Sequence, residues 1–274
     1  MPAAEGGQSE QARAGVAEAR AAKAAGRASA AEARATADAE VEEDYWSRSF
    51  SFTSPSRPDF AVTVKEAFHA GLGGTVWGGS VALARYLAAG AADSAAAELQ
   101  RGGKRELSAV ELGCGASGLP SLVLVHLRLI HHVCLTDCDE DCLEVLRENV
   151  AAAQQADNAT SVSVASLDWA ALGEAQPVDL VLCADVVYKM EDAEAERCTA
   201  AAAALVGAID RLAAEGAVVL LSHFVKPLHE ERAFIAALSG RFRCERVSGG
   251  GAGEEGGRED GMGIFRLHRE CKLT

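Results

Sequence analysis

The sequence is short of positive charge, contains no C-x-x-C pair and has no long apolar run. It has 26 Lys and Arg against 40 Asp and Glu, which gives a formal charge of −14. A free-standing nucleic-acid binder needs a basic face that displaces counterions, so no nucleic-acid partner is expected. The longest apolar stretch, residues 119–130, is interrupted by His126 and Arg128. A membrane span needs roughly 18 apolar residues, so we expect no membrane partner either.

The eight cysteines are scattered and lack the spacing of a typical metal site. Cys134, Cys138 and Cys142 lie near His131 and His132, but they fall in a predicted strand, turn and helix. Convergence of these side chains on one ion is therefore not expected, and we predict no metal site. Reduced thiols and the lack of a recognisable secretory signal favour an intracellular protein, in the cytoplasm or also in the nucleus.

Large apolar side chains are almost missing from residues 1–44, which are rich in Ala, Glu, Arg and Gly. Such a segment cannot bury enough surface to offset the entropy of ordering it. Its acidic residues are not typical of a transit peptide, which is Arg-rich and poor in acids. We predict a disordered or frayed helical tail over 1–44, followed by one domain over 45–274.

The hydrophobic pattern predicts regular elements from residue 49 onward. Alternating residues at 49–52 and 60–64, separated by turn residues, predict a β-hairpin. A helix is expected within 73–90, with Trp77, Val81, Ala84 and Ala88 on one face. Strands are then predicted at 108–112, 132–137, 161–169, 178–188, 217–223, 242–247 and 262–269, and helices at 118–130, 139–155, 191–214 and 228–239. Alternating strands and helices of this kind predict an α/β fold with a doubly wound, mostly parallel, seven-stranded sheet.

A glycine-rich loop follows the first strand of this alternating region. Gly113, Gly115 and Gly118 have the G-x-G-x-x-G spacing that is typical of nucleotide-cofactor loops. Asp137, at the end of the next strand, is suited to accept hydrogen bonds from ribose hydroxyls. These features are shared by NAD-binding proteins and by methyltransferases that use S-adenosyl-L-methionine. They do not decide between the two cofactors.

Glu111, two residues before the first glycine, helps to distinguish between the two cofactors. A carboxylate beside a pyrophosphate in a cleft of low dielectric is unfavourable. S-adenosylmethionine carries no phosphate, and its sulfonium and ammonium groups attract an acid. We therefore predict S-adenosylmethionine as the cofactor. An alternative is that Glu111 only caps a neighbouring loop.

Several motifs together resemble those of the seven-stranded protein methyltransferases. They are VWGGSVALARYL, ELGCGASGLP, LTDCDEDCLEVLRENV, SLDW and ADVVY, in this order. More narrowly, residues 60–269 resemble the lysine methyltransferase branch known as methyltransferase family 16. Trp77 before the glycine loop and the D-x-x-Y motif at Asp185 and Tyr188 make the resemblance specific. It implies a Rossmann-like methyltransferase fold.

The resemblance also implies roles for individual residues. The implied cofactor contacts are Trp77, Glu111, Gly113, Gly115, Asp137, Asp168, Trp169 and Ala184. Asp185 would orient the incoming amine, and Tyr188 would offer a ring face or hydroxyl beside it. The implied activity is transfer of a methyl group to a lysine of a protein substrate, and we expect a monomer.

Other functions remain open at this point. An NAD(P)-binding oxidoreductase or regulatory module would use the same glycines, but it predicts a second domain that carries the substrate. A non-catalytic interaction protein would keep the fold with a degraded pocket, which the intact Glu111, Asp137 and Asp185 argue against. A methyltransferase with an arginine, histidine or small-molecule acceptor is a further alternative.

Overall fold

A seven-stranded sheet forms the centre of the structure, a computed structural model that describes residues 45–156, 159–187, 195–224, 229–248 and 262–269. Its strands are β3 (Ser108–Leu112), β4 (His132–Asp137), β5 (Ser161–Ser166), β6 (Val178–Ala184), β7 (Ala213–Phe224), β8 (Phe242–Ser248) and β9 (Met262–Arg269). Their order is β5-β4-β3-β6-β7-β9-β8. The strands β3 to β7 are parallel, and β9 is antiparallel to β7 and β8. This arrangement confirms the predicted fold class.

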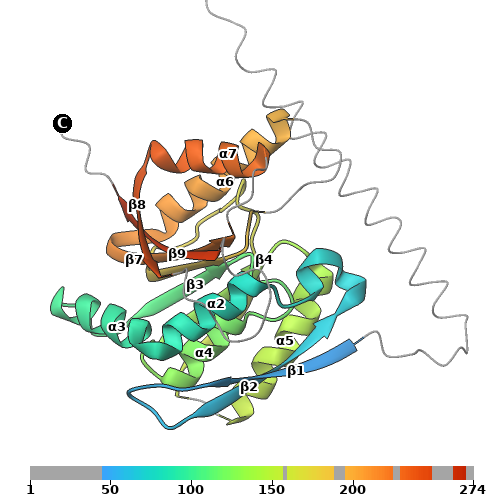
Figure 1. Cartoon of the computed structure of the whole chain (residues 1–274), viewed down its shortest axis with the longest axis vertical. Coiled ribbons are helices and arrows are strands. Elements are labelled where there is room, and N and C mark those ends of the chain that lie inside the picture. Colours follow the sequence, from blue (N-terminus) through green and yellow to red (C-terminus); the bar gives the residue numbers. More distant parts are fainter. Residues whose placement is uncertain (1–44, 157–158, 188–194, 225–228, 249–261, 270–274) are drawn as a thin grey trace, which may run out of the picture. The chain divides into compact units, whose positions relative to one another are not determined.

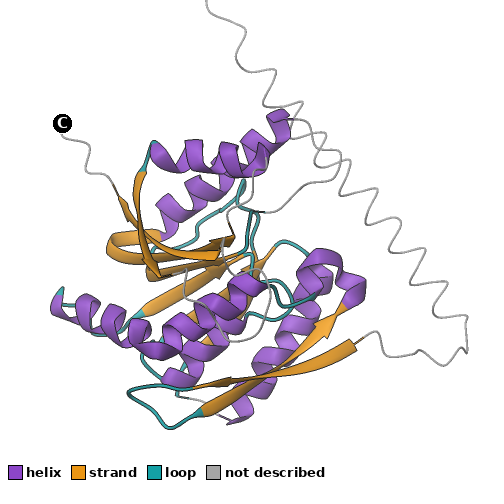
Figure 2. Ribbon diagram, viewed as in Figure 1, coloured by secondary structure: helices purple, strands orange, loops and turns teal. Residues whose placement is uncertain are grey.

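Helices cover both faces of the sheet (Figures 1 and 2). On one face lie α2 (Gly78–Tyr86), the π-helical turn η2 (Leu87–Ala91), α3 (Ala92–Arg101), α4 (Leu119–Leu127) and α5 (Glu140–Ala156); on the other lie α6 (Ala195–Leu212) and α7 (His229–Ser239). The strand β6 shows why both faces need cover. Leu180 and Leu182 join the core on the α4 side, whereas Val181 and Cys183 join the core under α6. A continuous apolar run is typical of such a central parallel strand.

Helix boundaries differ from the prediction on the N-terminal side of the sheet. The helix expected to continue to residue 90 ends at Tyr86, because Gly90 adopts a φ of 110° within the π-helical turn. The helix α3 was not predicted. Trp77 does not lie on a helical face with Ala84 and Ala88, as the spacing suggested. It precedes the helix as its N-cap and is 46% exposed, while the two alanines are buried.

The predicted hairpin is present as β1 (Tyr45–Phe52) and β2 (Phe60–Ala67), which pair in antiparallel fashion. It continues into the short 3₁₀ segment η1 (Phe68–Gly74). Val62 and Val64 of β2 are buried, because β2 packs on α4 and α5 (Figure 1). Most of β1 is exposed. The hairpin therefore adds a further layer outside the helices of that face.

The tail predicted over residues 1–44 lies outside the described residues, as does Tyr188. No helix within the described ranges is long and apolar enough to cross a membrane.

Asn149 of α5 joins the hairpin to the glycine loop. Its Oδ1 accepts a hydrogen bond from the Lys65 backbone N–H (2.7 Å), and its Nδ2 donates to the backbone oxygens of Lys65 (2.9 Å) and Ala116 (2.8 Å). The side chain is buried. Without this amide, backbone groups of a strand and of a loop would lack partners, which is costly in a buried position.

We predict that Asn149→Ala lowers the free energy of unfolding by about 2–4 kcal/mol, because it removes three hydrogen bonds and leaves buried backbone groups unpaired. Urea unfolding followed by circular dichroism measures this change. Gln155→Ala is the matched control, because Gln155 is an exposed amide on the same helix. Equal stabilities for the two variants would contradict the role given to Asn149.

Candidate functional site

The order of the strands locates the site at the carboxyl ends of β3 and β6. The chain runs from β3 outward through β4 to β5, and it then returns to form β6 on the other side of β3. Loops that leave these two neighbouring strands diverge, and in α/β sheets ligands bind in the crevice between them. The glycine loop follows β3, and Asp185 follows β6 directly. The glycine loop and Asp185 therefore lie at the same edge of the sheet.

The glycine loop needs its glycines for backbone shape and for close packing. Gly113, Gly115 and Gly118 have φ values of 64°, 61° and 54°, in the left-handed region that side chains disfavour. A Cβ on Gly115 would lie 2.4 Å from the backbone oxygen of Gly73, and one on Gly118 would lie 2.2 Å from Leu135 Cδ2. The loop thus presents bare backbone at the end of β3, as a cofactor cradle requires.

Glu111 is 1% exposed and lies at the end of β3. Its Oε2 accepts a hydrogen bond from the backbone N–H of Ser121 (2.9 Å), in the first turn of α4. Burial raises the pKa of this carboxyl to about 7, although the Ser121 contact opposes the shift. The structure therefore shows the capping contact that was considered as an alternative. With a pKa of about 7, the Glu111 carboxyl is near the midpoint of its titration at neutral pH, and a nearby cation favours its ionised form.

Asp137 faces the glycine loop from the end of β4. Its Oδ2 accepts a hydrogen bond from the Gly115 backbone N–H (2.9 Å), and its Oδ1 accepts one from the Asp139 backbone N–H (3.0 Å). The residue is half-buried. A carboxylate oxygen has two lone pairs, so each oxygen retains capacity for a hydroxyl donor. The carboxylate is thus held in one orientation, and its role as the ribose contact stays a prediction.

Asp168 and Trp169 follow β5. The Asp168 Oδ1 accepts a hydrogen bond from the Ala170 backbone N–H (3.0 Å), which shapes the turn. The indole of Trp169 lies close to the glycine loop, since a Cβ on Gly113 would be 3.0 Å from its Cζ2 and 3.1 Å from Val186 Cγ1. The structure therefore brings Trp169 and Gly113 together, as expected if both contact one cofactor.

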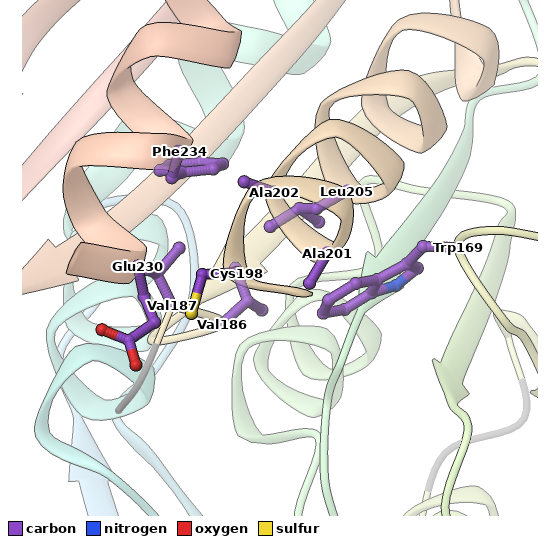
Figure 3. Close-up of a pocket in the computed structure, with 9 residues that line it drawn as sticks. All are labelled: Trp169, Val186, Val187, Cys198, Ala201, Ala202, Leu205, Glu230 and Phe234. Carbon is purple, nitrogen blue, oxygen red and sulfur yellow. The ribbon is translucent and has the colours of Figure 1, made fainter. Parts of the chain in front are cut away.

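An apolar cavity of about 110 Å³ lies beside Trp169, between the end of β6 and the helices α6 and α7 (Figure 3). It is lined by Trp169, Val186, Val187, Cys198, Ala201, Ala202, Leu205, Glu230 and Phe234. The sequence did not predict this cavity, because its walls come from four separate segments. Its lining is almost entirely apolar, in contrast to the polar groups around the glycine loop.

Asp185 is fixed by contacts that the sequence did not reveal. It adopts a φ of 52°, which Asp and Asn tolerate better than most residues. Its Oδ2 accepts a hydrogen bond from the Gly79 backbone N–H (2.7 Å) at the start of α2, where a negative charge is favoured. Its own backbone N–H donates to the Ser222 oxygen (3.1 Å), and the Ser222 hydroxyl donates to the Gly79 oxygen (2.7 Å). A closed set of hydrogen bonds thus joins β6, β7 and α2.

The glycine at position 79 is the one feature of the sequence from which this contact with Asp185 could have been predicted. A Cβ at that position would lie 2.6 Å from Asp185 Cγ, so only glycine lets the carboxylate approach the helix.

Trp77, Ala184 and Tyr188 complete the set of predicted residues. Trp77 precedes α2, and its Nε1 donates to the Leu72 backbone oxygen (2.7 Å). Ala184 is the last residue of β6 and is half-buried. Tyr188 lies outside the described residues, so its role stays a prediction.

The cysteines considered for a metal site do not form one in the described part of the chain. No group of three or more His, Cys, Asp or Glu side chains in those ranges is placed to hold an ion. Cys138 is exposed, whereas Cys142 is buried against η1. Burial raises the pKa of Cys142 to about 12, so it is a thiol at neutral pH and not a thiolate ligand.

The residues at this edge of the sheet fit S-adenosylmethionine. The glycine loop has a left-handed backbone that packs closely on its neighbours, Asp137 offers fixed acceptors for hydroxyl donors, and Trp169 offers an aromatic ring beside the loop. Glu111 supplies negative potential behind the glycines, which suits a cationic cofactor and disfavours a pyrophosphate. This combination favours the methyltransferase interpretation over that of an NAD(P)-binding oxidoreductase.

The chain is similar to several solved methyltransferase structures. Among solved structures, the glycopeptide N-methyltransferase MtfA complexed with sinefungin shares 13% identity and a TM-score of 0.49, over 72% of this chain and 89% of that chain. A TehB-like SAM-dependent methyltransferase from Corynebacterium glutamicum shares 12% identity and a TM-score of 0.41, over 64% and 87%. A methyltransferase from Pyrococcus furiosus shares 16% identity and a TM-score of 0.42, over 65% and 81%. No curated protein matches significantly.

These TM-scores lie below 0.5, so the assignment rests on the family match. The model of a family described as lysine methyltransferase matches residues 56–240, which is 185 of the 274 residues. The matched segment includes the glycine loop and every described site residue. The chain therefore belongs to the lysine methyltransferase family, and it is an S-adenosylmethionine-dependent methyltransferase.

Proposed function

We propose that the chain methylates the ε-amine of a lysine side chain in a protein substrate. The observation that carries this proposal is the position of Asp185, a half-buried carboxylate that directly follows the central strand β6 and whose neighbour Val186 lies against Gly113 of the glycine loop. The family match supports a lysine acceptor.

The cofactor, when bound, supplies an electrophilic methyl group on its sulfonium sulfur. The residues that would hold it are Trp77, Glu111, Gly113, Gly115, Asp137, Asp168, Trp169 and Ala184. Asp137 would accept hydrogen bonds from the ribose hydroxyls, and the ring of Trp169 would contact the adenine face. Gly113 and Gly115 allow the left-handed backbone that would place the groups of the loop beside the cofactor.

Asp185 would act on the acceptor amine. One of its oxygens is bound to the Gly79 N–H, so the carboxylate is held in position while a second oxygen is available to an incoming donor. The negative charge attracts a lysine ammonium, which must lose a proton before its nitrogen has a lone pair. A fixed acceptor then aligns the amine with the methyl group, which is the main contribution that an enzyme makes to such a displacement.

The substrate class is tested with purified protein, labelled S-adenosylmethionine and a cell lysate. Label on protein lysines, located by mass spectrometry, is the expected result. Label on arginine, histidine or small molecules alone would contradict the proposed acceptor and would favour one of the alternatives named above.

For Asp185→Asn we predict a loss of methyl transfer of at least tenfold, which corresponds to about 1.4 kcal/mol of barrier. Asn keeps an oxygen for the Gly79 N–H and tolerates the left-handed φ, so α2 stays in place and only the charge is lost. Single-turnover rates and calorimetric cofactor affinity are measured together, and the affinity should be unchanged. Glu215→Gln, at the amino end of β7, is the matched control. Full activity of Asp185→Asn would remove Asp185 from the acceptor site.

Glu111 generates a prediction about pH. Because its pKa is raised to about 7 in the folded protein, the native state holds a proton that the unfolded state releases. The stability of the cofactor-free protein should therefore fall as pH rises from about 4.5 to about 7, and should be constant above that range, with a total change of about 3 kcal/mol.

Glu111→Gln removes this ionisation. The variant should be more stable than the wild type at about pH 8 and similar to it at about pH 5. Its affinity for S-adenosylmethionine should nevertheless be lower at the higher pH, because the negative charge is gone. Urea unfolding and calorimetry measure the two quantities. Identical pH profiles for wild type and variant would show that Glu111 does not titrate in this range.

A further inference from the structure

Four large apolar side chains are exposed on adjoining segments of the hairpin and η1. Tyr45 and Trp46 begin β1, and Phe68 and Leu72 belong to η1; they are 37%, 58%, 56% and 55% exposed. We call these four residues the aromatic surface. The rings of Trp46 and Phe68 meet edge to face, with centroids 6.3 Å apart. A cluster of exposed apolar side chains is typical of an interaction site, whereas isolated ones are not.

The aromatic surface is held by buried contacts beneath it. Glu66 is 3% exposed, and its Oε1 accepts a hydrogen bond from the Val76 backbone N–H (2.6 Å) and pairs with Arg48 (3.3 Å). The carboxylate thus ties the segment after η1 to the strand β1. Tyr45 packs against His69, with ring centroids 5.3 Å apart, and Lys65 Nζ lies 3.7 Å from the centroid of its ring.

The aromatic surface is continuous with the cofactor loop. Gly73, the neighbour of Leu72, accepts a hydrogen bond from the Ala116 backbone N–H (2.8 Å). The Leu72 backbone oxygen accepts the Trp77 indole N–H. A protein bound to Leu72 would therefore lie next to residues that contact the glycine loop, within reach of the site where methyl transfer takes place.

One border of the aromatic surface, the start of α5, is acidic, whereas the nearby Arg48 and Lys65 are each paired with a glutamate. The first turns of α5 pack against η1 through the buried Cys142, and they carry Glu140, Asp141 and Glu144. Glu140 and Glu144 are exposed. The formal charge of the whole chain is −14. An apolar surface with an acidic border suits a partner that presents apolar side chains together with basic ones.

We propose that the aromatic surface and the acidic start of α5 bind the acceptor protein, through a basic segment that has apolar side chains near the methylated lysine. This inference rests on the proposed function, because it assumes a protein acceptor. It deepens that function by stating what surrounds the target lysine. Trp46 and Phe68 supply rigid aromatic contact area, of the kind that contributes most to binding at interfaces.

The test compares two synthetic peptides of equal charge. Both carry one acceptor lysine among arginines; the first has Leu and Phe near the lysine, and the second has Ser in their place. Peptide affinity is measured by fluorescence anisotropy with S-adenosylhomocysteine present, so that the readout does not depend on catalysis. The wild type should bind the apolar peptide at least tenfold more tightly than the serine peptide.

Substitutions on the chain locate the binding surface. The double variant Trp46→Ser/Phe68→Ser should lose the preference for the apolar peptide and keep its affinity for S-adenosylmethionine. Leu72→Ser, a single change at the border with the cofactor loop, should weaken the preference in the same direction. Ile235→Ser is the matched control, because Ile235 is 51% exposed on α7, on the opposite face of the sheet.

Two outcomes would overturn the inference. One is equal affinity of the wild type for both peptides; the other is a wild-type dimer, detected by sedimentation, that the double variant disrupts, since the aromatic surface would then bind a second copy of the chain. A different result is expected if the inference is correct but the proposed lysine methylation is wrong. The peptide preference would persist and depend on Trp46 and Phe68, but no methyl group would be found on lysine.

Discussion

Hydrogen bonds to the glycine loop join segments that are far apart in the sequence. The Gly115 N–H donates to Asp137 at the end of β4, the Ala116 N–H donates to Gly73 in η1, and the Ala116 oxygen accepts from Asn149 of α5. A loop of left-handed glycines exposes these backbone groups, because no side chain stands in the way. The position of the hairpin, the end of β4 and the shape of the proposed cofactor site therefore all depend on the glycine loop.

Acidic side chains at this edge of the sheet have structural and functional roles at once. Glu111 caps α4, Asp137 orders the glycine loop, and Asp185 fixes the start of α2. Glu111 and Asp185 each use one carboxylate oxygen on a backbone N–H, and Asp137 uses both, which restricts their rotation before any ligand binds. Such preorganisation reduces the ordering that binding requires. It also means that an alanine at any of these positions removes a structural contact together with a charge, whereas the amide variants of Asp185 and Glu111 separate the two.

Most of the fold was predictable, and the errors have local causes. The seven strands follow from apolar runs bounded by turn residues, and all are present. The end of the first helix at Tyr86 was missed, because the π-helical turn depends on Gly90 within an otherwise helical pattern. Trp77 was given a helical face because spacing alone does not show where a helix begins. Its indole instead bonds to the Leu72 oxygen, a partner supplied by a neighbouring segment.

The sequence by itself determined the seven strands, the glycine loop and the acids at the strand ends, because these follow from periodicity and residue type within one segment. Only the tertiary structure decided what those groups contact. The approach of Asp185 to Gly79, the link from Asn149 to the hairpin and the gathering of Trp46 with Phe68 each join distant segments. Packing distances of this kind depend on how the layers stack, and no local pattern encodes them.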